Sequence, residues 1–435
     1  MQADKAGVRD MGRTAIIGFG CAGYHAAKTL REGSPEMEID VYSATARAPY
    51  NPMLTTYFVS GKIPKEELFP FGDLKTLRKE LDLNVLTDSP VTRLYARERV
   101  VETARGRSEP YDDIIVCTGA SPAVPPFARG LEHGSYTMRT VEDALALEQA
   151  LRDGKVKSAG VVGGSMVGIK IVELLRQRDI KTILVDMAPR IFPLSACESV
   201  SEVIQRRLEE AGVEQRYACA LGGVTCTENG VLSTFADGSS AETDIIVFCA
   251  GIRANTLFLD ADEVELGRAV KVDLRMRTNV PHIYACGDCC EVADIQTGSS
   301  TSVGLWANAG EQGKVAARNI LGKSAEYQGN LIHNITHFMD MDFISIGNCA
   351  APGEHLRWEN RQDGWLVEVI MNEDRQPDCI NILDNAKISG PLKHLLIKRF
   401  KSPQAPLSAS VELRLIRSGV PTELIGILGG TMSGG

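Results

Sequence analysis

Hydrophobic runs in this chain twice end in a glycine-rich turn that leads into apolar residues at helical spacing. The first run covers residues 14–17 and passes through Gly18-Phe19-Gly20-Cys21-Ala22-Gly23 into a predicted helix over residues 24–30. The second covers residues 160–162 and passes through Gly163-Gly164-Ser165-Met166-Val167-Gly168 into a predicted helix over residues 169–178. Short apolar runs of this kind suit the buried centre of a parallel sheet. The pattern predicts two strand–loop–helix units about 145 residues apart.

Two further apolar runs repeat the duplication. Residues 111–122 form a predicted buried strand that ends in a small-residue turn, and residues 244–252 repeat this pattern. Two similar α/β domains are therefore expected, the second inserted into the first, with the chain returning to the first by residues 281–288.

The pattern changes after Gly329 to short strands, over residues 343–346 and 364–371, followed by a predicted helix over residues 391–400. The tail beyond Ser402 contains an apolar segment over residues 424–428 that either covers another subunit or packs on its own domain. Residues 429–435 have the composition of a flexible end.

The first glycine loop has the residues that a dinucleotide phosphate site requires. Gly18 permits the tight turn, Gly20 lets the backbone approach a pyrophosphate, and Gly23 lets the helix pack close to the strand. The free amide groups of the helix would then face the phosphates. Ser43 occupies the expected position of the ribose-binding acid and can still form a hydrogen bond to a hydroxyl. The alternative is a purely structural strand–turn–helix.

The second loop has serine in place of its middle glycine, between Gly163 and Gly168, and Ser165 there reduces the closeness of approach. The strand over residues 182–185 ends at Asp186, whose carboxylate can accept both ribose hydroxyls of NAD and repel the extra phosphate of NADP. We therefore predict NADH rather than NADPH. Asp186 as an ordinary solvated residue at a strand end is the alternative.

Composition indicates a large globular enzyme. With 435 residues, 44% hydrophobic and 24% charged, the chain can bury several cores, and two or three domains are expected. A net charge of -9 argues against a nucleic-acid surface. Neither a membrane-length apolar stretch nor a signal-peptide core is evident, and the eleven cysteines fit a reducing cytoplasm better than a disulfide scaffold.

With these motifs, the chain resembles the pyridine nucleotide-disulfide oxidoreductase superfamily, in its ferredoxin reductase, nitrite reductase and NADH oxidase-like branch. The resemblance covers roughly Arg13 to Asn385. Besides both loops, the matching segments are Pro49-Tyr50-Asn51, Thr118-Gly119-Ala120-Ser121-Pro122, Ala250-Gly251-Ile252-Arg253, Arg277-Thr278, Ala285-Cys286-Gly287-Asp288, Leu305-Trp306 and Gln312-Gly313.

The resemblance implies FAD and NAD as cofactors and an α/β fold. Two Rossmann-like, three-layer dinucleotide-binding domains would be joined by an α+β C-terminal interface domain. The FAD-binding domain would comprise residues 1–125 and 255–328, the NAD-binding domain residues 126–254, and the interface or dimerisation domain, with its extended tail, residues 329–435.

By the same likeness, Asp288, beside Gly287, would bind the ribityl chain, and Thr118 and Gly119 would pass close to it. Val91 would contact the adenine end through its backbone, and a helix beginning over Ser302–Trp306 would face the pyrimidine edge of the flavin. The corresponding nicotinamide site would include Gly163, Ser165, Gly168, Asp186 and Gly251, with Met166 in place of an aromatic gate.

Departures from the family pattern narrow the predicted mechanism. Relatives that work through sulfur carry a cysteine in the segment over residues 49–58, where this chain has none. Where relatives keep a basic residue near flavin N5 and a glutamate after the second loop, this chain has Thr55 or Thr56 and Lys170. Lys170 would hold a carboxamide, an anionic flavin or an acid of a partner, or is a surface lysine. These three residues are the candidate catalytic groups.

Other clusters of cysteine, histidine and basic residues have simpler interpretations than a redox or metal site. Cys286 and Cys289 have the spacing of a redox pair or half a metal site, but the same segment is needed for the ribityl turn. His333 and His337 would share one helix face, although the residues between them favour a strand. A basic cluster over residues 393–401 is a solvated helix face or a docking site for an acidic protein. We predict no metal site.

The predicted function is a FAD-dependent oxidoreductase that exchanges hydride with NAD(H) and electrons with an iron–sulfur or ferredoxin-like protein. The acceptor would be a separate carrier, or the chain would be the NAD-reducing subunit of an anaerobic 2-oxoacid oxidoreductase complex of the phenylglyoxylate dehydrogenase type. Either a homo-oligomer or a hetero-oligomeric complex is expected. A self-contained NADH oxidase and a non-catalytic flavin-binding structural subunit are the alternatives.

Overall fold

The computed structural model describes residues 12–360, 362–402 and 407–429, which fall into two compact units. Unit 1 comprises the chain up to Leu54, Ile63–Ser121 and Ile252–Asn330. Unit 2 comprises Thr55–Lys62, Pro122–Gly251 and the chain from Leu331. Residues 1–11 and 430–435 lie outside the described residues, and with them most of the predicted flexible C-terminal end.

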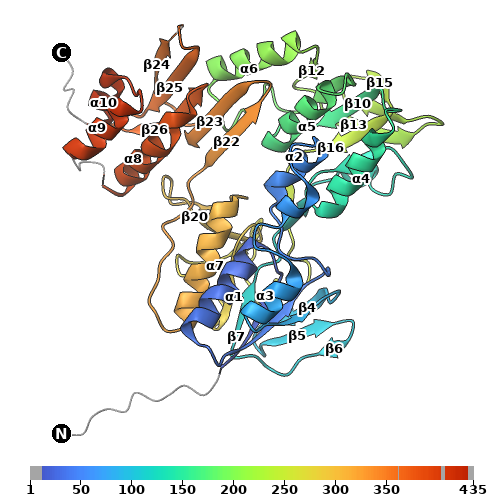
Figure 1. Cartoon of the computed structure of the whole chain (residues 1–435), viewed down its shortest axis with the longest axis vertical. Helices are drawn as coiled ribbons and strands as arrows, with labels where there is room; N and C mark the ends of the chain where they lie inside the picture. The colour runs from blue at the N-terminus through green and yellow to red at the C-terminus, as the bar shows by residue number, and fades with distance from the viewer. Residues whose placement is uncertain (1–11, 361, 403–406, 430–435) are drawn as a thin grey trace. The chain divides into compact units, whose positions relative to one another are not determined.

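Unit 1 is built on a five-stranded parallel sheet in the order β19-β7-β1-β2-β3. Helices α1 and α7 lie side by side in this unit, and their small residues permit close approach (Figure 1). A Cβ on Gly313 of α7 would overlap the carbonyl oxygen of Ala22 on α1. The bounds are β1 Arg13–Ile17, α1 Cys21–Gly33, β2 Glu38–Tyr42, α3 Leu74–Glu80, β3 Asn84–Leu86, β7 Asp113–Val116, β19 Ile283–Ala285 and α7 Trp306–Ile320.

Two small sheets complete unit 1. One is an antiparallel meander of β4 Val91–Tyr95, β5 Val100–Thr103 and β6 Gly106–Arg107. The other contains β18 Val270–Lys271, β20 Cys290–Ala293 and β21 Ser300–Thr301. A two-stranded ribbon of β8 Ala120–Pro122 and β17 Ile252–Ala254 lies where the chain leaves unit 1 and returns to it.

Unit 2 contains a second five-stranded parallel sheet, in the order β12-β11-β10-β16-β9. Its strands are β9 Ser135–Thr137, β10 Ser158–Val162, β11 Lys181–Val185, β12 Glu214–Arg216 and β16 Ile245–Phe248. Its helices are α4 Val141–Arg152, α5 Met166–Arg176 and α6 Glu198–Glu210, and its meander contains β13 Leu221–Cys226, β14 Val231–Phe235 and β15 Ser240–Thr243. The short helix α2, Thr55–Val59, packs against α4 and α5.

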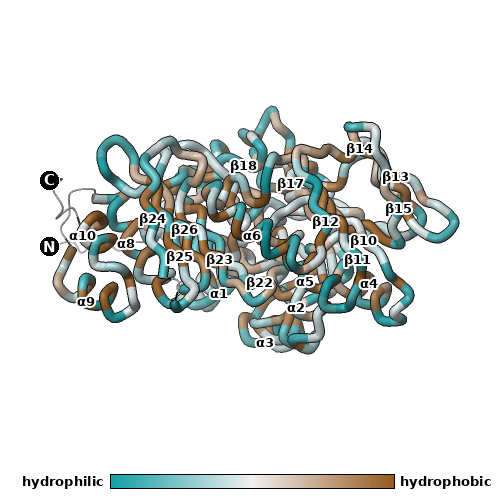
Figure 2. The backbone as a smooth tube through the Cα atoms, turned by 90° about the horizontal axis from the view of Figure 1, so that it is seen from above, coloured by the Kyte–Doolittle hydropathy of each residue, from teal (hydrophilic) through white to brown (hydrophobic). Residues whose placement is uncertain are grey.

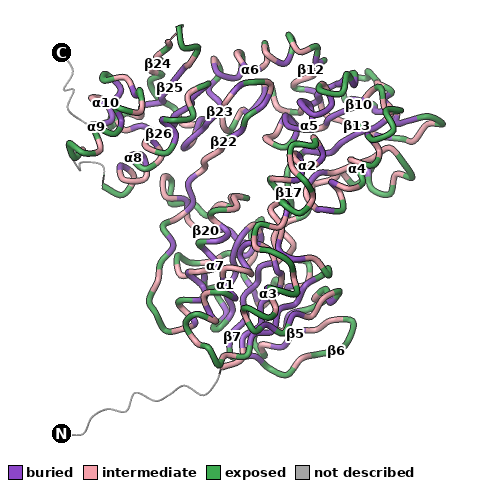
Figure 3. The backbone as a smooth tube through the Cα atoms, viewed as in Figure 1, coloured by how far each residue is buried: buried purple, intermediate pink, exposed green. Residues whose placement is uncertain are grey.

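The C-terminal part of unit 2 is an antiparallel sheet in the order β22-β23-β26-β25-β24. Brown, hydrophobic residues follow the inner strands in Figure 2, and β23 is buried along most of its length in Figure 3. The edge strand β24 alternates exposed and half-buried positions, as expected for a strand with one solvated face. The strands are β22 His333–Phe338, β23 Met341–Gly347, β24 Glu354–Asn360, β25 Trp365–Met371 and β26 Pro377–Leu383.

In the described part of the chain, three α-helices follow this sheet: α8 Ser389–Lys401, α9 Ala409–Arg417 and α10 Thr422–Gly429. The apolar tail segment predicted to cover either a second subunit or its own domain lies in α10, where Leu424, Ile425 and Leu428 are buried within this chain. Trp358 Nε1 on β24 donates to Glu423 at 3.2 Å and connects the tail to the sheet. The tail therefore packs on its own domain.

The predicted α/β class with two Rossmann-like sheets is confirmed, as is the return of the chain to its first sheet. The proposed three-domain division stays a prediction, because the compact units join residues 122–251 with the chain from Leu331. Residues 55–62 also group with unit 2, although the sequence placed them within the first domain.

Candidate functional site

The first glycine loop is crowded at two glycines and open at the third. A Cβ on Gly18, whose φ is +102°, would overlap the carbonyl oxygen of Cys117. A Cβ on Gly23 would overlap the carbonyl oxygen of Gly18, whereas one on Gly20 would meet nothing within 4 Å. Gly20 is also the N-cap of α1, so the free amide groups of the helix begin at the open position. The loop therefore has space for a pyrophosphate at Gly20, and the binding of FAD by these glycines stays a prediction.

Ser43 and Val91 lie near the strand ends where the resemblance places the adenosine half of FAD. Ser43 is buried, and its hydroxyl donates to the carbonyl oxygen of Thr45 at 2.8 Å, so it is available to a ribose only as an acceptor. Val91 begins β4, opposite Thr103. Their assignment to cofactor binding remains a prediction.

Thr118 and Gly119 form a turn that is held by Asn255. Thr118 Oγ1 donates to the carbonyl oxygen of Asn255 at 2.7 Å, and Asn255 Nδ2 returns a bond to the Thr118 carbonyl at 3.0 Å. The Asn255 amide donates to the carbonyl of Gly119, a residue with φ of +64°. Sequence reasoning missed Asn255, although it follows closely on the motif at residues 250–253. The turn predicted to pass along the flavin is therefore held by three hydrogen bonds with Asn255.

The Gly287-Asp288 turn is positioned by α7. The Gly287 amide donates at 2.7 Å to Oε1 of Gln312, a side chain that is 3% exposed. The sequence singled out Gln312 only as part of a motif and did not predict this contact. Helix α7 was predicted to begin over Ser302–Trp306. It begins at Trp306, the last residue of that range.

The cysteines beside this turn are buried thiols. Cys289 donates to the carbonyl of Cys286 at 3.2 Å, and Cys290 donates to that of Gly287 at 3.3 Å. Burial raises the pKa of Cys289 to about 12, and it also raises the pKa values of Cys286 and Cys290. The Cys289 and Cys290 thiols therefore take part in the hydrogen bonding of the turn, and Cys286 and Cys289 are not joined by a disulfide. These contacts favour the turn over a Cys286–Cys289 redox pair.

The second loop, in unit 2, repeats the crowding of the first. Gly163 has φ of +104°, and a Cβ on Gly168 would overlap the carbonyl oxygen of Gly163. Ser165 caps α5: its hydroxyl accepts from the Gly168 amide at 3.1 Å and donates to the Cys249 carbonyl at 2.9 Å. The serine is thus part of the loop's own hydrogen bonding. Met166 begins α5, and Gly251 has a left-handed φ of +99°.

Asp186 is tied to the second loop. One carboxylate oxygen accepts from the Gly164 amide at 2.6 Å, and the other accepts from the Ala188 amide at 2.8 Å. The side chain therefore lies beside the phosphate loop, which disfavours the alternative of an ordinary solvated residue. Each oxygen retains acceptor capacity for a ribose hydroxyl.

Lys170 is 8% exposed, so its interpretation as a surface lysine is wrong. Its Nζ donates to Glu173 and, at 2.5 Å, to the carbonyl oxygen of His337, and it lies 5.1 Å from the centre of the Tyr57 ring. Sequence reasoning missed Glu173, although a separation of three residues on a helix was the available signal. Thr55 and Thr56 are buried in α2 of the same unit. A catalytic role for these three residues remains a prediction.

The remaining predicted clusters do not form ligand sets within the described residues. His333 and His337 lie on the strand β22, not on a helix, where His333 pairs with Lys393 and His337 with Asp342. The basic cluster is not one solvated face, because Arg399 is buried and Lys393 points to His333.

Nine cysteines are free, but Cys349 and Cys379 form a disulfide that the sequence did not predict.

No helix in the described part of the chain combines the length and apolar character required to cross a membrane.

Some known proteins are similar to this chain in sequence, and some solved structures are similar to it in fold. An NADH oxidase of Methanocaldococcus jannaschii is 28% identical over 421 residues, covering 92% of this chain and 94% of that protein. Subunit epsilon of the NADH-dependent phenylglyoxylate dehydrogenase of Aromatoleum evansii is 26% identical over 389 residues, covering 88% and 91%. The solved water-forming NADH oxidase of Lactobacillus brevis, bound to NADH, superimposes with a TM-score of 0.84 at 18% identity, covering 97% and 100%.

The family model of the pyridine nucleotide-disulphide oxidoreductases matches residues 12–313, which include both glycine loops, the Thr118-Gly119 turn and the Gly287-Asp288 turn. The predictions of an oxidoreductase and of FAD and NAD(H) as cofactors are thereby confirmed. Because this match covers more than half of the chain and spans both loops, the chain belongs to the pyridine nucleotide-disulphide oxidoreductase family.

Proposed function

We propose that this oxidoreductase passes electrons from NADH, through FAD, to an iron–sulfur or ferredoxin-like protein without a sulfur relay. Bound flavin supplies the conversion between hydride transfer and single-electron transfer. The glycine loops would hold the two pyrophosphates, Asp186 would select NADH, and the turns held by Asn255 and Gln312 would position the flavin.

One observation carries the proposal: the described residues of unit 1 and of helix α2 offer no reactive thiol. The segment over residues 49–58, where sulfur-dependent relatives carry a cysteine, contains none. All five cysteines of unit 1 are buried, and burial raises the pKa of Cys21 to about 12. Because a thiolate is the reactive form of cysteine, electrons that reach the flavin must leave by another route.

The acceptor is proposed to be a partner protein within a complex of the 2-oxoacid oxidoreductase type. Support comes from the similarity to subunit epsilon of phenylglyoxylate dehydrogenase over most of both chains. The similarity to an NADH oxidase over 92% of this chain supports a second candidate, direct reaction with oxygen.

The test is acceptor choice by the purified, flavin-loaded protein. NADH is added without oxygen, bleaching of the flavin is followed, and the reduced protein is then mixed with a [2Fe–2S] ferredoxin, with oxygen or with a disulfide. We expect bleaching, followed by ferredoxin reduction at least about tenfold faster than oxygen or disulfide reduction. Faster oxygen consumption would select the oxidase, and a flavin that does not bleach would select a non-catalytic subunit. Anaerobic co-purification from the native source, with iron counted, then tests the complex.

A further inference from the structure

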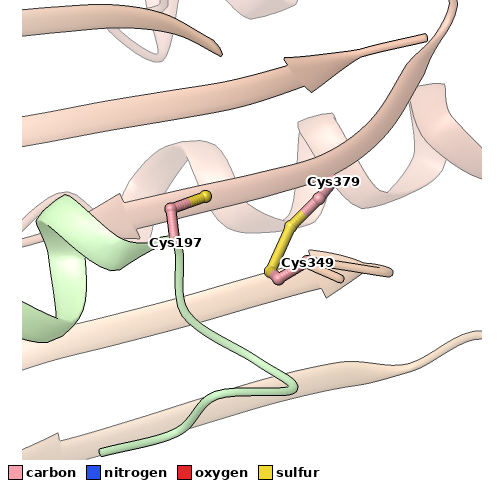
Figure 4. A group of neighbouring side chains, drawn as sticks. All are labelled: Cys197, Cys349 and Cys379. Atoms are coloured by element: carbon pink, nitrogen blue, oxygen red, sulfur yellow. A yellow bond between two sulfur atoms is a disulfide. The ribbon is translucent and has the colours of Figure 1, made fainter. Parts of the chain in front are cut away.

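Three cysteines from separate parts of unit 2 meet in its interior, outside the site described above (Figure 4). Cys197 is the N-cap of α6, Cys349 follows β23, and Cys379 lies in β26. The three sulfur atoms lie within 4.8 Å of one another, and all three residues are buried. Cys349 and Cys379 form a disulfide, which leaves Cys197 as a free thiol beside it.

We propose that these residues form a thiol–disulfide exchange centre, in which Cys197 replaces Cys349 as the partner of Cys379. A thiol next to a disulfide is the arrangement that exchange requires, because the attacking sulfur must reach one sulfur of the existing bond. The inference is independent of the proposed electron acceptor.

The polar surroundings favour Cys349 as the sulfur that leaves. Its Sγ lies 3.3 Å from Nδ2 of Asn381 and 3.6 Å from the hydroxyl of Ser345, two donors that would stabilise a thiolate. The carbonyl oxygen of Ser195, 2.9 Å away, would accept a hydrogen bond from the Cys349 thiol once that sulfur is protonated. Cys379 has one such contact, to the same Nδ2 at 3.6 Å. A leaving sulfur with more hydrogen-bond donors departs more readily.

Two groups hold Cys197 in place and connect it to solvent. Its amide donates to Oδ1 of Asn381 at 2.7 Å, so one buried asparagine contacts all three cysteines. The carboxylate of Glu368 and the ring of His355 lie within 4.8 Å of the Cys197 sulfur. Glu368 is 3% exposed and is hydrogen-bonded at 2.8 Å to Nδ1 of His355, which is solvent-exposed. This pair is a path for the proton that Cys197 must lose.

The step balances without an external oxidant or reductant. Cys197 gives its proton to Glu368, which releases it through His355 to solvent, and the Cys197 sulfur bonds to Sγ of Cys379. The bond between Cys349 and Cys379 breaks, and Cys349 leaves as a thiolate that takes up one proton from solvent. One disulfide and one thiol are present before and after. Since burial raises the pKa of Cys197 to about 12, little thiolate is present at neutral pH, and exchange is expected to take minutes to hours.

Exchange would change what the crosslink connects. The Cys349–Cys379 bond lies within the C-terminal sheet, whereas a Cys197–Cys379 bond would join the start of α6 to that sheet. The disulfide would then crosslink the part of unit 2 that carries the second glycine loop to its C-terminal sheet.

Disulfide mapping of the full-length, flavin-loaded protein tests the proposal. The protein is held at pH 8.5 for several hours, quenched in acid and alkylated after unfolding, and its non-reduced peptides are identified by mass spectrometry. We expect a Cys197–Cys379 peptide at least about tenfold more abundant than any mispair of the partly exposed Cys226. Finding only the Cys349–Cys379 peptide would overturn the proposal.

Variants and metal analysis sharpen the result. In a glutathione buffer, Cys349→Ser should form the Cys197–Cys379 bond, and Cys197→Ser should retain only Cys349–Cys379. Cys226→Ser is the matched control and should behave as the unmodified protein. If Cys349→Ser does not fold, the mapping of the unmodified chain still decides. Metal analysis of the anaerobically purified protein is a further test. If each chain holds about one zinc ion and thiol alkylation releases it, the three cysteines form a metal site and the exchange proposal is wrong.

Discussion

Lys170 and Glu173 form an ion pair on the buried side of α5, one helical turn apart. The Glu173 carboxylate also accepts from the Met339 amide at 3.2 Å and lies 3.6 Å from Nζ of Lys62. Together with the bond from Lys170 to the His337 carbonyl, this cluster connects α5 with β22 and with the segment after α2. The pair thus joins three separate stretches of sequence within unit 2.

Replacement of Glu173 by Gln should destabilise the protein more than removal of both charges. Glu173→Gln leaves the Lys170 ammonium buried without its partner, and the cost is expected to be about 3 kcal/mol. The double variant Lys170→Met, Glu173→Leu should lose less, because no unpaired charge remains. Urea unfolding measures both. The control is Glu148→Gln, which breaks the exposed Glu148–Arg152 pair on α4 and should cost at most about 0.5 kcal/mol. An equal loss of unfolding free energy in Glu173→Gln and Glu148→Gln would contradict the prediction.

Substitutions in the first glycine loop should separate flavin binding from folding. Gly20→Ala places a methyl group where the chain leaves space, so the protein should fold normally but bind FAD about tenfold more weakly or worse, a loss of at least ~1.4 kcal/mol. Gly23→Ala drives a methyl group into the Gly18 carbonyl and should lower stability itself by about 1–3 kcal/mol. Flavin absorbance per chain and thermal unfolding report the two effects. Gly390→Ala, at an open position of α8, should retain full flavin content. A Gly20→Ala protein that retains flavin with unchanged affinity would refute the assignment of this loop.

Asp186 should determine the choice between NADH and NADPH. Asp186→Ser removes the charged acceptor of the ribose hydroxyls, so kcat/KM for NADH should fall roughly 10–100-fold, whereas that for NADPH should rise or stay level. Asp186→Asn keeps an acceptor without the charge and should show a smaller loss with NADH. Steady-state rates with ferricyanide as acceptor measure both coenzymes. Equal losses with the two coenzymes would mean that Asp186 acts only by holding the Gly164 amide.

His333 should make the protein less stable in mild acid. Burial, together with the neighbouring Lys393, lowers its pKa from 6.5 to about 4. Because the unfolded chain takes up this proton first, the stability is fully present above pH 6.5 and is lost as the pH falls toward 4. The loss should be about 1–2 kcal/mol, allowing for the partial exposure of the ring.

Urea unfolding between pH 7 and pH 4 would show this slope, and His333→Gln should remove it. The control His337→Gln replaces an exposed ring paired with Asp342 and should leave the slope in place. An identical pH dependence in His333→Gln and the unmodified protein would contradict the assignment.

The sequence by itself determined the features that short stretches of chain encode. Glycines at Gly18, Gly23, Gly163 and Gly168 mark places where a side chain would overlap the neighbouring backbone, and apolar runs beside them mark the buried strands. Both depend on residues within one strand–loop–helix unit. For this reason the order of residues along the chain was sufficient to identify the two loops, the α/β class and the family.

Only the tertiary structure decided which distant residues meet. Asn255 at the Thr118 turn, the burial of Lys170, the packing of α10 on its own domain and the meeting of Cys197 with Cys349 and Cys379 all bring separated segments together. Such contacts depend on how whole sheets and helices pack, and no local spacing records them. Burial was therefore needed to exclude a surface position for Lys170 and to show that the tail packs on its own domain.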